Sequence, residues 1–337
     1  MNGKKPTSHD VARLAGVSQT TVSYVMSGRR AVAPETENRV LHAMEELGYH
    51  PHSGARALRS SRSNVIGLVV PQHAGADPVA QHQFLISLAH QARAHDYDIL
   101  LVTADEGTSG LRRVMDSALC DGLLLMEVLA HDPRADMIAD SHTPAVFIGI
   151  PDSCAPITAI DSDYEYAGRH AVDILAQSGH TRITLLAPGD TSLQDLNFIE
   201  RFRNAVYEHA AASAIEIREH KVTLSYQNAI SQLEYLNLGY GDALLLAPTT
   251  PTDDWCNALR NKNLIPGQHV SLVASSWDYT HSHTLDRPCH FDMRMGEVTK
   301  QAMNLLLERI DAPTPSTPDH HLITPFFHEG DTLRTLT

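Results

Sequence analysis

Short, unbroken apolar runs separated by helix-length segments dominate the chain from residue 64 onward. NVIGLVV, YDILLV, DGLLLM and AVFIGI come first, and TRITLLA, DALLLA and VSLVA follow. Strands without polar alternation are buried on both faces, as they are in parallel sheets that carry helices on each side. The pattern therefore predicts an α/β body of doubly wound parallel sheets, and the length of the chain suits two such sheets side by side.

The first fifty residues predict a small helical unit instead. TSHDVARLAGVSQTTVSYVMSG and PETENRVLHAMEELGY carry apolar residues at helical spacing. Gly16 suits a left-handed turn between the first two helices, and Ser18 is placed to cap the second. Pro34 suits the first turn of a third helix and Gly48 its end. The arrangement predicts a helix-turn-helix head. The residues expected to pack inward are Val11, Leu14, Ala15, Val17, Val22, Val25, Met26, Val40, Leu41, Met44 and Leu47.

Charge is divided unevenly between this head and the rest of the chain. Residues 1–62 carry nine Lys and Arg against five Asp and Glu, or +4, whereas the remaining 17 against 35 leave −18. A basic head on an acidic body favours contact between the head and phosphate groups, with chance clustering of surface charge as the alternative. The stretch LAGVSQTTVSYVMSG, in contrast, holds no charged residue. Uncharged hydrogen-bonding side chains on a helix suit the base edges of the major groove.

The segment HDVARLAGVSQTTVSYVMSGRRAVAPETENRVLHAMEELGYHPHSGARALRS resembles the DNA-binding head of the LacI/GalR family of bacterial transcription regulators. The resemblance implies that Gln19 and Thr20 read base edges together with Tyr24, where many members carry Arg. A phenol cannot make the bidentate contact of a guanidinium, so the operator half-site is expected to differ at that base. The residues that the resemblance assigns to backbone phosphates are Thr7, Ser18, Thr21, Ser23, Arg29 and Arg30.

The stretch HPHSGARALRSSRS follows the head and predicts a linker. Gly54 and the serines make it a poor helix in isolation. Similar segments in the family form a hinge helix in the minor groove, where a leucine wedges between base pairs. By this resemblance Leu58 is the wedge, with Ala55, Arg56 and Arg59 around it. Without the resemblance, packing of Leu58 in a core is an equally good interpretation.

The stretch DSDYEYAGRHAVDILAQSGHTRITLLA is similar to the family's effector-binding body, which shares the two-lobed fold of periplasmic binding proteins. The predicted limits are 1–49 for the head, 50–63 for the hinge and 64–337 for the body, with a first lobe of about 64–161 plus 292–327, which includes a helix near 294–310, and a second lobe of about 162–291. Ligands of parallel sheets bind beyond the carboxyl ends of the strands. The cleft between the lobes is therefore the expected effector site.

Polar anchors typical of the family's sugar-binding members are missing from this body. By the resemblance, Phe198 stands where those members carry Arg, Thr249 is part of a replaced Asn-Asp pair, and Ser276 replaces a later Asp. A less hydroxylated or partly planar effector is expected, and a body without an effector is the second possibility. The candidate effector residues, each of which could equally serve lobe packing or a loop surface, are Gln72, His73, Asp77, Asp161, Phe198, Thr249, Ser276, Trp277 and Asp278.

Motifs for other classes of protein are absent from the sequence. It contains no nucleophile elbow, no GxxxxGK and no GxGxxG that opens a helix, so neither an enzyme nor a cofactor is expected. GTSG at 107–110 is interpreted as a turn. The histidine pairs 281/283 and 320/321 lack further ligands at suitable spacing, so no metal is expected. No apolar run is long enough to span a membrane or to form a signal peptide, which predicts a cytoplasmic protein.

These features together predict a homodimeric, sequence-specific transcription regulator that acts as a repressor. It is expected to bind a palindromic operator in double-stranded DNA, because a single head buries too little surface to select one site in a genome. A small-molecule effector in the cleft is expected to control it. The alternative from another class is a cytosolic small-molecule-binding protein or an enzyme on the same two-lobed fold, with a non-functional head.

Overall fold

The structure is a computed structural model. It describes residues 6–27, 30–49, 62–70, 78–103, 107–117, 119–190, 193, 195–223, 225–278, 280, 282–312 and 316–336. The chain divides into two compact units, residues 1–65 with 117–121 and residues 66–116 with 122–337. We call the three helices of the first unit the head and the two-sheet part of the chain the body. Within the described ranges, no helix combines the length and apolarity needed to cross a bilayer.

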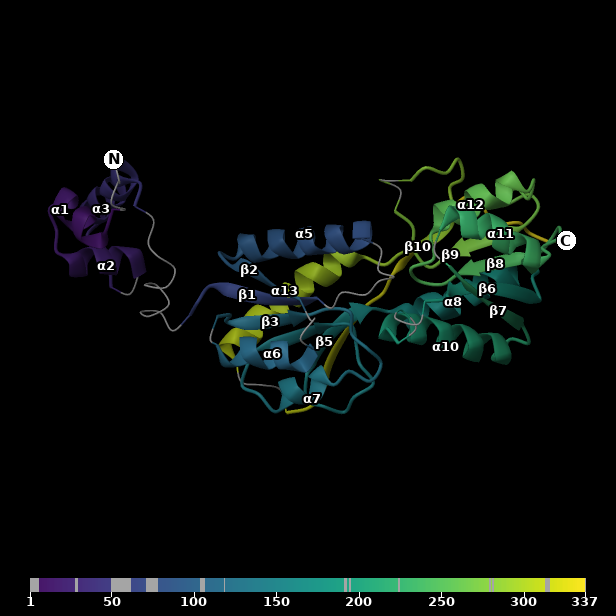
Figure 1. The fold of residues 1–337 in the computed structure, drawn as a ribbon, viewed down its shortest axis with the longest axis horizontal. Helices are drawn as coiled ribbons and strands as arrows, with labels where there is room; N and C mark the ends of the chain where they lie inside the picture. Colours follow the sequence, from purple (N-terminus) through teal and green to yellow (C-terminus); the bar gives the residue numbers. More distant parts are fainter. Residues whose placement is uncertain are drawn as a thin grey trace. The chain divides into compact units, whose positions relative to one another are not determined.

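The head consists of α1 (Ser8–Ala15), α2 (Gln19–Ser27) and α3 (Pro34–Leu47), as Figure 1 shows. Gly16 ends α1 with φ 65° and Gly48 ends α3 with φ 58°, both in the left-handed region that glycine adopts without strain. The predicted helices and their two glycine stops are therefore confirmed.

One apolar residue from each helix forms the centre of the head. Val11, Val22 and Val40 are fully buried, and smaller residues and Tyr49 close the cluster. The prediction that Leu14 and Leu41 pack inward is wrong, because their side chains are 45% and 49% exposed. Each lies one position, about 100° of helix rotation, from a neighbour that fills the core.

The first lobe of the body is a six-stranded sheet with the order β11-β5-β4-β3-β1-β2. Its strands are β1 (Val65–Val70), β2 (Asp98–Thr103), β3 (Gly122–Leu125), β4 (Ala145–Ile148), β5 (Thr158–Ser162) and β11 (Asp319–Ile323). From β11 through to β1 all pairs are parallel. Helices α5 (Pro78–Ala94) and α13 (Met295–Asp311) bury one apolar face of the sheet, and α6 (Gly107–Asp116) and α7 (Arg134–Ala139) lie on the other side in Figure 1.

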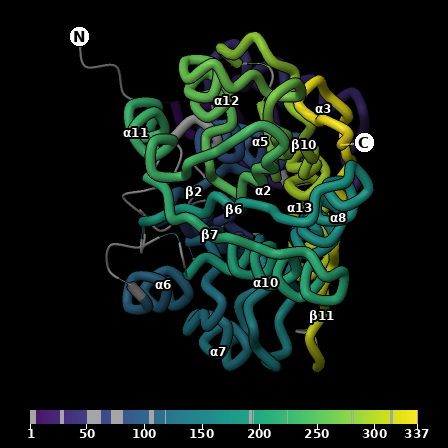
Figure 2. The backbone as a smooth tube through the Cα atoms, turned by 90° about the vertical axis from the view of Figure 1, so that its right-hand side faces the viewer, coloured from purple at the N-terminus to yellow at the C-terminus, as the bar shows by residue number. Residues whose placement is uncertain are grey.

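The second lobe is also a six-stranded sheet, with the order β12-β10-β9-β8-β6-β7. Its strands are β6 (Arg182–Pro188), β7 (Glu216–Val222), β8 (Ala243–Leu246), β9 (Ser271–Ala274), β10 (Cys289–Asp292) and β12 (Phe326–His328). Helices α8 (Tyr164–Gln177) and α10 (Asn197–Ala212) lie side by side on one face, as Figures 1 and 2 show, and α11 (Tyr226–Leu236) and α12 (Thr252–Asn261) cover the other. The fully buried Trp255 anchors α12 in this core.

The body agrees with the predicted fold class and departs from the prediction in two details. The expected helix near 294–310 is α13, packed on the first sheet. Phe326 and Phe327, predicted in the first lobe, belong to β12, which pairs antiparallel with β10 in the second sheet. GTSG is not an isolated turn, because α6 begins at Gly107. The strand β12 is short and its partner is distant in sequence. The residues of GTSG favour turns, so its place in a helix is not visible from its composition.

Candidate nucleic-acid interface and lobe junction

Hydrogen bonds within the head fix the starting points of α1 and α2. The Ser18 hydroxyl accepts a hydrogen bond from the Thr21 backbone N–H at 3.0 Å, so its predicted role as a cap is confirmed. Thr7 caps α1, and its N–H and hydroxyl both donate to the Asp10 carboxylate, at 2.9 and 2.7 Å. Such bonds satisfy donors that the first turn of a helix leaves unpaired. The head therefore presents α2 on a capped, packed frame.

The outward face of α2 is uncharged and rich in hydrogen-bonding groups. Its side chains are Gln19 and Thr20, which are exposed, and Thr21, Ser23 and Tyr24, which are half-buried. The Gln19 amide donates one hydrogen bond to the Ser8 hydroxyl at 2.9 Å. An amide has a second N–H and a carbonyl oxygen, so Gln19 keeps groups with which to contact a base edge.

The hydroxyl groups at the starts of α1 and α2 differ in what they can offer a phosphate. Ser18 Oγ and Thr21 Oγ1 lie 2.8 Å apart, and only one of their two protons lies between them. The other proton can be donated to a phosphate oxygen. The Thr7 hydroxyl proton is instead donated to Asp10, whose carboxylate would repel a phosphate. The geometry favours Ser18 and Thr21 over Thr7 as phosphate contacts.

Tyr24 lies beneath a basic side chain from the segment after α2. The Arg30 guanidinium carbon is 5.9 Å from the centre of the Tyr24 ring, within the range of a cation–π interaction. Arg30 itself is exposed. The remaining predicted DNA contacts, Arg29, Ala55, Arg56, Leu58 and Arg59, lie outside the described residues.

The predicted effector residues follow strands of both sheets. Asp161 lies near the carboxyl end of β5, Thr249 follows β8, and residues 276–278 follow β9. These are the strand ends at which α/β sheets bind ligands. Three further candidates, Gln72, His73 and Asp77, lie outside the described residues.

Asp161 and Phe198 lie on the α10 side of the body. Arg201 Nη1 donates to Asp161 Oδ2 at 3.0 Å, and Arg201 Nε donates to Glu165 Oε1 at 3.2 Å. Burial raises the pKa of the Asp161 carboxyl to about 7, although the Arg201 guanidinium acts to lower it. The Phe198 ring packs with its centre 5.1 Å from that of Tyr164. Asp161 is therefore paired with a cation from the chain itself.

Trp277 and Asp278 lie on the opposite, α5 side of the body. The Trp277 indole donates to Asp253 Oδ1 at 2.7 Å, which fixes the ring within the second lobe. Asp278 Oδ2 accepts a hydrogen bond at 3.0 Å from the amide of Gln83 on α5, so this contact joins the two lobes. Ser276 is exposed, and its carbonyl accepts a hydrogen bond at 3.0 Å from the Thr252 hydroxyl at the start of α12. The structure thus distributes the predicted residues over two sides of the junction.

Two strand ends carry residues with unusual backbone conformations. Glu127 after β3 has φ 50°, and Thr249 after β8 has φ 70°, which is costly for a β-branched side chain. Thr249 Oγ1 is buried without a hydrogen-bond partner among the described residues. Glu127 Oε1 accepts a hydrogen bond from the Gln81 amide at 2.7 Å. Such strain concentrates at functional sites, which favours Thr249 as an effector residue and adds Glu127.

Arg201 and Glu165 are not predicted as site residues from the sequence. In the sequence Arg201 is one of two basic residues in NFIERFR, and nothing in that stretch indicates its partner. Glu165 is one acidic residue among several at the start of α8. Their role becomes visible only when the fold brings α8, α10 and the end of β5 together.

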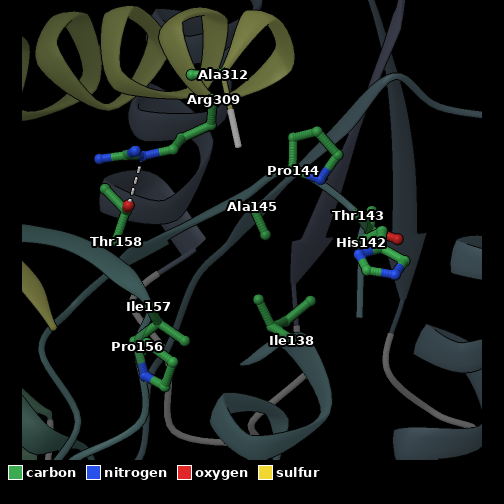
Figure 3. Close-up of a pocket in the computed structure, with 10 residues that line it drawn as sticks. All are labelled: Ile138, His142, Thr143, Pro144, Ala145, Pro156, Ile157, Thr158, Arg309 and Ala312. Atoms are coloured by element: carbon green, nitrogen blue, oxygen red, sulfur yellow. Dashed lines mark hydrogen bonds between the residues drawn. The ribbon is translucent and has the colours of Figure 1, made fainter. Parts of the chain in front are cut away.

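A small cavity lies at the opposite end of the first sheet, where β4 and β5 begin (Figure 3). Arg309 reaches it from α13, donating to Thr158 Oγ1 at 2.9 Å and to Asp319 Oδ2 at 2.5 Å. Its volume of about 30 Å³ has room for one or two water molecules. This cavity is too small for a metabolite, so the carboxyl ends of the strands stay the candidate effector region.

Comparisons with known proteins find relatives for both the head and the body. The family model of bacterial regulatory proteins of the lacI family matches residues 7–52. The HTH-type transcriptional regulator AglR of Rhizobium meliloti is 30% identical over 283 residues, which cover 78% of this chain and 76% of AglR. The HTH-type transcriptional regulator MalR of Streptococcus pneumoniae is 32% identical over 212 residues, 60% of this chain. That match spans 62% of MalR, less than two thirds of its length.

Solved structures share the fold over nearly the whole chain. The lac repressor dimer bound to operator and the anti-inducer ONPF superposes with a TM-score of 0.81 at 23% identity, covering 98% of this chain and 100% of that one. A complex of the transcriptional regulator CelR with cellobiose gives 0.66 at 22% identity, covering 97% and 99%. At these identities the likeness concerns the fold alone.

Proposed function

The chain belongs to the LacI family of bacterial regulatory proteins, and on this premise we propose that it is a sequence-specific DNA-binding repressor controlled by a small-molecule effector. The observation that carries the proposal is the outward face of α2, which is uncharged and held on a capped three-helix frame. A helix of this kind suits readout of base edges in the major groove.

Base reading is proposed for three residues of α2 and for Arg30, which is expected from the sequence to contact a phosphate and is reassigned here because it lies over Tyr24. Gln19 and Thr20 are exposed at the start of the helix, where recognition helices contact bases. Tyr24 lies one turn after Thr20 and carries Arg30 over its ring. We assign Tyr24 and Arg30 to one reading unit, in which the phenyl ring orients the guanidinium and the guanidinium supplies paired donors for a guanine.

Phosphate contacts are proposed for the hydroxyl groups that flank this face and for the basic residues after α2. Ser18 and Thr21 share one hydrogen bond and keep one proton to donate. Ser23, Arg29 and Thr7 keep their sequence-based assignment, with Thr7 acting chiefly as the cap of α1. For the hinge, Leu58 remains the proposed minor-groove wedge, with Ala55, Arg56 and Arg59 as its neighbours.

A homodimer is proposed from apolar surface on the first lobe. Helix α5 packs against β2, which is an edge strand of its sheet. Ile86 of α5 and Leu101 of β2 are 44% and 52% exposed. A second copy that covers this surface would give a two-fold-symmetric molecule, and such a molecule matches a palindromic operator.

The effector is proposed to bind where the lobes face each other at the carboxyl ends of their strands. The Tyr164–Phe198 ring pair, the strained Thr249 and the Gln81–Glu127 pair offer flat apolar surface together with a few polar groups. This combination supports a partly planar effector with few hydroxyl groups. The CelR neighbour was solved with the sugar cellobiose, so sugars serve as the comparison set in the screen, and the proposal expects compounds with fewer hydroxyl groups to bind more tightly.

Selection of DNA from a random pool by the full chain tests the proposed function. A repressor of this family recovers a two-fold-symmetric sequence, and binding to random duplex weakens with salt as counterions are released. A small-molecule-binding protein or enzyme with a non-functional head recovers no common sequence and shows almost no salt dependence. Thermal-shift screening of the same preparation against metabolites then identifies the effector by the stabilisation it gives.

A further inference from the structure

The two lobes are joined along the amino-terminal end of α10. The Asn197 backbone N–H donates to the Val128 carbonyl at 3.0 Å, and the Ala130 N–H donates to the Asp195 carbonyl at 3.1 Å. The Asn197 side-chain amide donates to the Ile150 carbonyl at 2.6 Å. Val128, Ala130 and Ile150 follow strands of the first sheet, whereas Asn197 opens a helix of the second lobe. A short stretch of backbone pairing therefore spans the junction.

A buried ion pair lies one helical turn further along α10. Arg201 bonds to Asp161 of the first sheet at 3.0 Å and to Glu165 of α8 at 3.2 Å. The side chains of Arg201 and Asp161 are only 15% and 6% exposed. Removing one partner of a buried pair leaves the other uncompensated, which is costly. Arg201 thus links a strand of one lobe to a helix of the other.

Several charged and titratable groups act on this ion pair. Arg201 and Asp163 act on Asp161, the first attracting its charge and the second repelling it. Glu165 competes for the same guanidinium from α8. Burial lowers the pKa of the His320 imidazole on β11, and the charge of Arg201 acts in the same direction. Arg201 is the cation to which the carboxylates of β5 and α8 both bond.

We propose that α10 holds the two lobes of this chain together through its own residues. We call the contacts that Asn197 and Arg201 make across the junction the clasp, and the Arg201 guanidinium is its charged part. Asn197 supplies the neutral part of the clasp through its backbone and amide hydrogen bonds. The Asp161–Arg201 pair supplies the part that depends on charge. The proposal concerns the body alone and does not depend on DNA binding.

The charged part of the clasp responds to pH in a defined direction. Burial raises the pKa of Asp161 to about 7, so this carboxyl loses its charge when the pH falls through neutrality. Because burial at the junction is what raises this pKa, the joined lobes bind the proton more tightly than separated lobes would, and a lower pH favours the joined state. The lobes are therefore held more firmly at pH 6 than at pH 8.

Hydrogen–deuterium exchange on the full chain tests the clasp directly. The amides of Ala130 and Asn197 donate across the junction, so peptides that contain them report its opening. In Arg201→Met these peptides are expected to exchange roughly tenfold faster than in the parent chain, because a buried charge has lost its partner. Arg203→Met is the matched control, since Arg203 lies on the same helix and pairs with Glu219 inside the second lobe.

Two further variants keep the test decisive. Arg201→Lys retains the charge with a single donor group, so intermediate exchange is expected, and it serves if Arg201→Met does not fold. Asp161→Asn is expected to remove the pH dependence of exchange, after correction for the intrinsic rate. Unchanged exchange at Ala130 and Asn197 in the Arg201 variants, or an equal increase in Arg203→Met, overturns the proposal. Neither result depends on whether the chain binds an operator.

Discussion

The Arg30 guanidinium lies over the ring of Tyr24, 5.9 Å from its centre, on the outward side of the second head helix. Tyrosine alone offers a base one hydroxyl group, whereas the stacked pair offers a fork of donors on a flat support. The pair therefore brings a guanidinium beside α2 at a position where Tyr24 itself offers only a hydroxyl group.

Separate substitutions in this pair should have different effects. Arg30→Ala is expected to cost about 1–3 kcal/mol of operator affinity and to relax selection at one base position, because a bidentate contact is lost. Tyr24→Phe keeps the ring under Arg30 and should cost less than Tyr24→Ala. Affinity measured on the selected operator and on variants at each base checks this. Uniform weakening across all sequences would assign Arg30 to a phosphate instead.

The head core provides a stability prediction with a control inside the same unit. Val22→Ala removes two methyl groups from a fully buried site and should destabilise the head by about 2 kcal/mol. Leu14→Ala, on a side chain that is 45% exposed, should change stability by about 0.5 kcal/mol or less. Chemical denaturation of the full chain, followed by a probe in the head, measures both. Equal losses would mean that Leu14 packs in the core after all.

The hinge prediction rests on sequence and compares binding to the operator with binding to random duplex DNA. Leu58→Ala should weaken binding to the operator far more than binding to random duplex, because wedging into a kinked site is the step it removes. Titrations at one fixed salt concentration compare the two. Arg29→Ala is the companion variant, for which the proposed phosphate contact predicts similar losses on both DNAs. Equal losses for Leu58→Ala contradict the wedge.

The dimer prediction uses the exposed apolar residues of the body. Leu101→Lys should produce a monomer in sedimentation experiments, because an unpaired lysine buried at an interface costs about 3 kcal/mol or more. Leu285→Lys is the control, since that side chain is 88% exposed on the second lobe, away from β2. A parent chain that is already monomeric, or a Leu101 variant that stays dimeric, contradicts the proposed interface.

Asp161 makes the stability of the body depend on pH. Its pKa is about 7 in the folded chain against 3.8 for an ordinary carboxyl, so the folded state holds a proton that the unfolded state releases. Proton binding at Asp161 stabilises the folded state fully below pH 3.8, and this stabilisation is lost as the pH rises through about 7. The free energy of unfolding of the parent should therefore fall relative to that of Asp161→Asn as the pH rises from 5 to 8. A constant difference between the two proteins contradicts the raised pKa.

Local patterns predict the head and the sheets well because short-range physics determines them. Gly16, Ser18 and Gly48 act within one helical turn, and unbroken apolar runs leave few alternatives to buried strands. Leu14 and Leu41 were expected in the core because apolar character alone does not tell which of two adjacent positions faces inward.

Contacts between distant segments set the limit of prediction. Phe326 pairs with Asp292 across an antiparallel bridge that no local pattern announces. Arg201 and Asp161 are separated by 40 residues, and only the packing of α10 beside the end of β5 brings their charges together. Thr249 shows its strain only as a backbone angle. The region proposed for the effector depends on such contacts, and so its residues follow less directly from the sequence than those of the head.

Whether α2 reads DNA is measured by the affinity of the full chain for its selected two-fold-symmetric sequence, compared with its affinity for a scrambled duplex of equal length at the same salt concentration. We expect the selected sequence to bind roughly a thousandfold or more tightly, and Gln19→Ala with Thr20→Ala to remove most of this ratio. Equal affinity for the two duplexes, or a ratio that survives both substitutions, contradicts the claim that α2 reads DNA.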